Sequence, residues 1–121
     1  MHEILTPGAP LDILFASEKL ELLCHDDRLA TRTLGAPSAR KLRARLDDLI
    51  SSANLDYARN LPGRFHALTG DRAGQYAVDL QAGRRLVVAP ANDPLLSRPD
   101  GSLDLTKVTI ISVIYVGDYH D

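Results

Sequence analysis

The sequence predicts an α+β fold in which two N-terminal helices pack on a mainly antiparallel sheet of four to five strands. Apolar residues recur with a helical period between residues 36 and 53. From residue 64 onward the chain consists of short, strand-like segments separated by turns that contain Gly, Asp and Pro. The order is strand, helix, helix and then four strands, and this separation favours α+β over a parallel wound sheet.

The length and composition indicate one ordinary globular domain over residues 1–121, since 121 residues suit a single hydrophobic core. Residues 1–10 end in the turn-forming sequence TPGAP and are interpreted as an N-terminal extension. The start lacks the features of a secretory signal, and no apolar run reaches the roughly 18 residues of a membrane span. The only cysteine, Cys24, excludes an internal disulfide. We therefore expect a cytoplasmic protein with no membrane contact.

The first predicted strand covers residues 11–16 and places alternate apolar residues on one face. Ser17 then begins a helix, because its hydroxyl can accept hydrogen bonds from first-turn amides. We expect this helix to continue to residues 31–34 and to stop at Gly35.

The second helix begins at residues 36–38, where Pro37 is tolerated in the first turn. It should end near Asn54, and a connector should follow over residues 55–63. The apolar face of this helix comprises Ala39, Leu42, Leu46, Leu49, Ile50 and Ala53.

The strands that follow are predicted at residues 64–69, 75–80, 84–89 and 108–116. The last of these is almost continuously apolar and β-branched, which is typical of a central strand buried on both faces. Residues 91–106 contain two strong turn signals and are interpreted as an inserted loop.

The net charge of −2 conceals an uneven distribution along the chain. Residues 1–27 carry a net charge of −5, residues 28–72 carry +5 and residues 73–121 carry −2. Eleven of the fourteen cationic side chains are Arg, the side chain suited to bidentate phosphate contacts. Arg40 and Arg43 on the second helix are therefore candidate RNA contacts. The alternative is that the basic side chains Arg40, Lys41, Arg43 and Arg45 form a solvated helix face.

Three segments of the sequence together resemble HigB-type toxins of the RelE/ParE superfamily. Residues 61–74, LPGRFHALTGDRAG, resemble a stretch containing a His and a Gly-Asp-Arg turn. Arg85, followed by Leu86, resembles the next strand of that family, and residues 118–120, DYH, resemble its closing segment. The resemblance implies a RelE/ParE-like fold and a toxin that cuts mRNA, typically on the ribosome. It also implies a partner, a helix-turn-helix antitoxin of the HigA type.

The resemblance also implies the residues of the site. Those expected to be catalytic are His66, Arg72, Arg85, Tyr119 and His120, and further candidate RNA contacts are Arg64 and Asp118. Attack of a ribose 2′-hydroxyl on the adjacent phosphate needs a base, an acid and a cation that stabilises the phosphorane. Histidine suits the first two roles and arginine the third. This chemistry requires no metal, and we expect no cofactor.

Structural roles remain open for several of these residues. His66 could be a hydrogen-bonded structural histidine, and Arg72 could be solvated or paired with Asp71. Tyr119 could stack on a base or close the edge of the core. His120 lies near a chain end, where disorder is common.

Two other functions are compatible with the sequence. One is a non-enzymatic toxin like the ParE branch, which acts by binding DNA gyrase. The other is an inactive relative retained as a binding partner of an antitoxin. The pair of histidines favours the nuclease, whereas Thr69, where the family usually has Lys, and the slightly acidic balance favour the alternatives.

Overall fold

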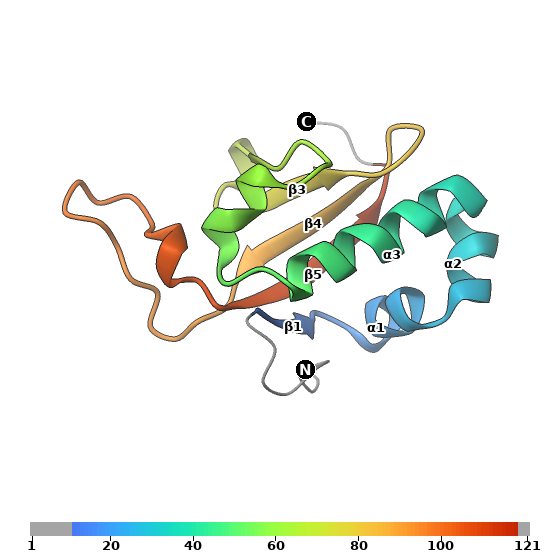
Figure 1. The fold of residues 1–121 in the computed structure, drawn as a ribbon, viewed down its shortest axis with the longest axis horizontal. Coiled ribbons are helices and arrows are strands. Elements are labelled where there is room, and N and C mark those ends of the chain that lie inside the picture. Colours follow the sequence, from blue (N-terminus) through green and yellow to red (C-terminus); the bar gives the residue numbers. More distant parts are fainter. Residues whose placement is uncertain (1–10, 119–121) are drawn as a thin grey trace.

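A computed structural model describes residues 11–118, in which a five-stranded sheet forms the centre of the molecule (Figure 1). The strand order is β1-β5-β4-β3-β2, with β1 parallel to β5 and all other neighbours antiparallel. The predicted α+β class and mainly antiparallel sheet are therefore confirmed, and the last strand lies between two others as expected. The strands are β1 (Asp12–Phe15), β2 (His66–Ala67), β3 (Tyr76–Asp79), β4 (Arg85–Pro90) and β5 (Ile110–Gly117).

Three α-helices precede the antiparallel strands, so the prediction of two N-terminal helices is wrong. They are α1 (Glu18–His25), α2 (Asp27–Leu34) and α3 (Ala36–Ile50). The expected first helix is interrupted at Asp26, whose backbone is extended (φ −105°, ψ 103°). The Asp26 carboxylate accepts hydrogen bonds from the amides of Arg28 and Leu29 at 3.0 and 3.1 Å. This N-cap satisfies amides that a continuous helix would have bonded internally, and so it starts a new helix.

The helices cover one face of the sheet, where the main hydrophobic core lies. Leu42, Leu46 and Leu49 of α3 are almost fully buried against strand residues such as Val88 and Val113. The helical period predicted for this segment is thus confirmed, although α3 ends at Ile50 and Ala53 is exposed. A second, smaller cluster of Leu68, Ala77 and Val87 lies on the opposite sheet face and contains no residue of α1–α3.

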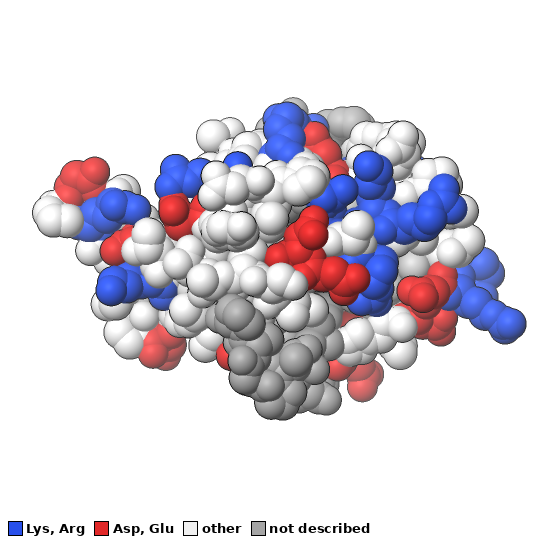
Figure 2. All heavy atoms as spheres, viewed as in Figure 1, with Lys and Arg blue, Asp and Glu red and all other residues white. Residues whose placement is uncertain are grey.

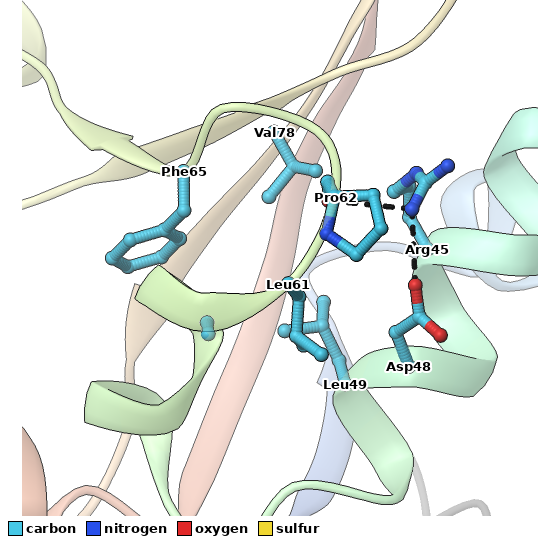
Figure 3. Close-up of a pocket in the computed structure, with 8 residues that line it drawn as sticks. Arg45, Asp48, Leu49, Leu61, Pro62, Phe65 and Val78 are labelled. Atoms are coloured by element: carbon cyan, nitrogen blue, oxygen red, sulfur yellow. Dashed lines mark hydrogen bonds and ion pairs between the residues drawn. The ribbon is translucent and has the colours of Figure 1, made fainter.

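Arg45 connects α3 to the loop that leads into β2 (Figure 3). Its Nη1 donates to Asp48 Oδ2 at 3.0 Å and to the carbonyl oxygen of Pro62 at 3.3 Å. Only 8% of Arg45 is exposed, so the interpretation of this residue as part of a solvated helix face is wrong. Together with its apolar neighbours it encloses a cavity of about 10 Å³, too small for more than one water molecule.

The segment between β4 and β5 projects from one end of the sheet (Figure 1). It contains an isolated bridge between Ser97 and Leu103 and a short 3₁₀ helix at Leu105–Lys107. Hydrogen bonds from Ser102 lower the pKa of Asp100, and the hydroxyl of Thr106 does the same for Asp104. The proposed N-terminal extension, residues 1–10, lies outside the described residues, and the single-domain interpretation stays a prediction. No helix within residues 11–118 is long and apolar enough to cross a membrane.

The loop after Pro62 depends on glycine. Gly63 has φ +110°, and an added Cβ would lie 2.6 Å from Val78 Cγ1 and 3.0 Å from Arg45 Cδ. Gly74 has a similar φ of +90° but has no atom within 4 Å of such a Cβ. We predict that Gly63→Ala lowers the free energy of unfolding by about 2–4 kcal/mol, because backbone strain and overpacking add. Gly74→Ala, which adds strain alone, should cost about 1 kcal/mol.

Urea denaturation of both variants measures the difference. Equal losses would show that the close contact with Val78 and Arg45 relaxes at no cost, which would contradict the rigid loop described above.

Candidate functional site

The sheet face opposite the helices brings several of the expected site residues together. The register pairs His66 with Ala77, Ala77 with Val87, and Val87 with Tyr115, so these four residues form one row across β2, β3, β4 and β5. Directly paired residues point to the same face of a sheet. His66 and Tyr115 therefore lie on one face, on either side of the small side chains of Ala77 and Val87.

A second row on the same face runs beside the first and carries the charges. Asp79 pairs with Arg85, and Arg85 pairs with Gly117. Asp79 Oδ1 lies 3.4 Å from Arg85 Nε, and Arg64 Nε donates to Asp79 Oδ2 at 2.8 Å. A further bond joins Arg64 Nη2 to Asp79 Oδ1 at 3.3 Å. One carboxylate thus bridges two of the arginines expected to bind RNA.

The backbone at Arg64 is strained in a way that supports this bridge. Arg64 has φ +54°, a left-handed conformation that costs a residue with a side chain about 1–2 kcal/mol. The amide of Asp79 donates to the carbonyl oxygen of Gly63 at 2.6 Å, which ties the loop to the end of β3. The ion pair with Asp79 and this backbone bond together hold the strained residue in place.

His66 has a defined tautomer. Its Nδ1 lies 2.7 Å from the carbonyl oxygen of Arg64, an atom that can only accept a hydrogen bond. Nδ1 therefore carries the proton and donates it to this carbonyl. In the neutral ring, Nε2 is then the basic nitrogen that can exchange a proton with a ligand.

Arg72 follows the turn at Gly70–Arg72, a short 3₁₀ helix, and is held above β5. Its Nη1 donates to Gln75 Oε1 at 3.0 Å, and its Cζ lies 5.1 Å from the centre of the Tyr115 ring. This distance is within the range of a cation–π interaction. Gln75 and Tyr115 thus orient the guanidinium of Arg72 over the open face of the sheet.

Tyr115 and Asp79 are the residues of this site that the sequence analysis missed. The alternation of β5 signals Tyr115 only after its irregularity near residue 114 is known, because the register shifts between Val87 and Val88. Gly117 permits the position of the ring, since a Cβ there would lie 2.7 Å from the Tyr115 hydroxyl oxygen. Asp79 carried no motif, and its role follows only from its pairing with Arg85.

Two expected RNA contacts lie elsewhere. Arg40 and Arg43 are on α3, on the side of the sheet that the helices cover. Arg43 donates to the carbonyl oxygen of Cys24 and lies 3.7 Å from Asp47, so it links α3 to the end of α1. Arg40 is exposed beside the groove between α2 and α3. Figure 2 shows basic side chains over these helices with acidic side chains among them.

The C-terminal candidates are described only in part. Asp118 follows β5 directly and is exposed, whereas Tyr119 and His120 lie outside the described residues. Because Gly117 pairs with Arg85, the chain leaves the sheet beside the Arg64–Asp79–Arg85 cluster.

Two other kinds of chemistry have no support in the described part of the chain. Within residues 11–118, no group of three His, Cys, Asp or Glu side chains could hold a metal ion. Burial raises the pKa of the Cys24 thiol to about 12, so this cysteine stays protonated at neutral pH and is a poor nucleophile.

Comparisons with known proteins identify the fold. No family model matches the sequence, and no curated protein is significantly similar to it. Among solved structures, the chain is similar to the YoeB dimer from Staphylococcus aureus, with a TM-score of 0.54 and 18% sequence identity. The match covers 93% of this chain and 100% of that chain. At this identity the similarity shows the fold alone, and the chain therefore has the α+β fold of YoeB, consistent with the expected RelE-like architecture.

Proposed function

We propose that this chain is the toxin of a type II toxin–antitoxin pair and that it cleaves mRNA as a metal-independent endoribonuclease. The observation that carries the proposal is the open sheet face on which His66, Arg64, Arg72 and Arg85 converge. The fold shared with YoeB supports the same interpretation, as does the resemblance of residues 61–74 and 118–120 to HigB-type toxins.

The geometry suits attack of a ribose 2′-oxygen on the adjacent phosphorus. A base takes the 2′-hydroxyl proton, the bond to the 5′ oxygen breaks, and an acid protonates that oxygen, leaving a 2′,3′-cyclic phosphate. In our proposal His66 and His120 share the base and acid roles, and Nε2 of His66 is the atom that exchanges the proton. Arg85 and Arg72 bind the scissile phosphate and stabilise the charge of the phosphorane. Arg64 and Asp118 contact the RNA backbone nearby.

The remaining residues and partners extend this proposal. Tyr119 contributes to catalysis from the segment that follows Asp118. Arg72, which is held flat over Tyr115, offers a surface on which a nucleobase can stack. Arg40 and Arg43 make secondary contacts with RNA or the ribosome at the helical face. The toxin acts in the cytoplasm and is neutralised by a HigA-type helix-turn-helix antitoxin.

The first test is induced expression of the chain without an antitoxin. We predict growth arrest together with new 5′ ends in cellular RNA. His66→Ala, Arg85→Ala and His120→Ala should each reduce cleavage by roughly 100-fold or more, because each removes a proton-transfer group or a phosphate ligand. Arg32→Ala is the matched control, since Arg32 is an exposed arginine of α2. It should leave cleavage unchanged.

The outcomes separate the candidate functions. Arrest with DNA damage and intact RNA would replace the nuclease with a gyrase-binding toxin, and Thr69 would then be a leading clue. Full toxicity in all three alanine variants would refute the assigned residues, provided that circular dichroism shows that each variant is folded.

A second prediction concerns the proton on His66. Long-range ¹H–¹⁵N correlation spectra at a pH where the ring is neutral should show the Nδ1–H tautomer, because the Arg64 carbonyl oxygen accepts from Nδ1. The spectrum of His66→Gln assigns the signal by its loss. A protonated Nε2 in the neutral ring would contradict the proposed proton exchange at this atom.

A further inference from the structure

The two arginines at the centre of the candidate site are already bound to an anion of the protein itself. Asp79 accepts from Arg64 at 2.8 and 3.3 Å and lies 3.4 Å from Arg85 Nε. We infer that Asp79 acts as a built-in competitor of the substrate phosphate, and that it determines how tightly, and with which charge, a phosphate group binds to Arg64 and Arg85. This inference rests on the proposed function, because it concerns the same site.

The position of Asp79 supports competition. Its amide is bonded to the carbonyl oxygen of Gly63, and its neighbour Val78 is buried in the core, so the backbone that carries the carboxylate is fixed. The side chain itself is 34% exposed, and that of Arg64 is 59% exposed. A ligand can therefore reach the groups of the ion pair from solvent, while the carboxylate stays close to both cations.

The charges indicate which phosphate the site prefers. Arg64, Asp79 and Arg85 together carry a net charge of +1. An internal phosphodiester carries one negative charge and balances this cluster, whereas a terminal phosphate monoester approaches two negative charges near neutral pH. A second negative charge would lie close to the Asp79 carboxylate and be repelled. The cluster thus favours internal diesters over chain ends, and an endonuclease must make this choice.

Replacing Asp79 by Asn tests the inference, since the amide keeps the size of the side chain and removes its charge. The first probe is a 2′-O-methyl oligonucleotide with a 5′-hydroxyl end, which lacks the attacking hydroxyl and stays intact. Fluorescence anisotropy should show that Asp79→Asn binds it roughly two- to thirty-fold more tightly than the wild type, the range expected when two partly exposed ion pairs no longer compete. Asp71→Asn, at an exposed acid in the turn before Arg72, is the matched control and should change binding by less than about two-fold.

A second probe measures the preference for charge. A 5′-phosphorylated copy of the oligonucleotide should gain more from Asp79→Asn than the unphosphorylated copy does. Arg64→Gln should reduce the gain from Asp79→Asn in the double variant, because one of the two competing contacts is then already absent. Unchanged or weaker binding by a folded Asp79→Asn variant would overturn the inference and make Asp79 a residue that only positions the arginines.

A third probe separates this inference from the proposed function. Pyrophosphate binding, read as a rise in melting temperature, needs the two arginines but no RNA recognition. If no variant binds the oligonucleotide but Asp79→Asn gains stabilisation by pyrophosphate, the RNA proposal fails and the role of Asp79 stands. If wild type and variant bind RNA equally well, the RNA proposal stands and the role of Asp79 fails. Absence of binding by both probes would refute both.

Discussion

The packing of α3 against one face of the sheet is the constraint on which the rest of this structure depends. Leu42, Leu46 and Leu49 bury the sheet on that side, and side chains of alternate parity along β3, β4 and β5 must then point to the other side. A one-residue slip in β4 would move Arg85 into the apolar core and Leu86 onto the open face. The same burial that stabilises the fold therefore aligns the polar row formed by Asp79 and Arg85, with no separate interaction needed to orient it.

The loop before β2 transmits this order to the remaining site residues. Arg45 extends from the buried side of α3 to the Pro62 carbonyl oxygen, and Gly63 fits between Arg45 and Val78. Arg64 follows in a left-handed conformation, and its carbonyl oxygen fixes the His66 ring. The buried Nε of Arg45 has no hydrogen-bond partner within the described residues. This cost is retained at the residue that connects the helical layer to the polar loop, a combination typical of functional regions.

Local periodicity was sufficient for much of the fold but not for the site. The α3 helix, the central position of β5 and the order of the strands follow from short-range patterns of apolar residues. The break at Asp26 was missed, because an Asp that caps a new helix can also fit within a continuing one. Asp79 and Tyr115 were missed for a different reason. Their importance comes from partners on other strands, and a register irregularity near residue 114 determines which side chains of β5 face the site. The resemblance to HigB-type toxins, in contrast, indicated His66, Arg72 and Arg85, which do share one region of the sheet.

The central place of β5 has a consequence for the order in which the molecule forms during synthesis. β5 pairs with β1 in register from Asp12 with Ile110, nearly a hundred positions away in the chain, and it also pairs with β4. A nascent chain that has not yet released residue 117 therefore has no partner for β1, and Val87 lacks the neighbour that covers it. Such long-range pairing slows folding relative to helices of similar size. A ribosome would have nearly finished translating this protein before the open face existed in its final form, so the cell's own synthesis delays the appearance of the finished surface.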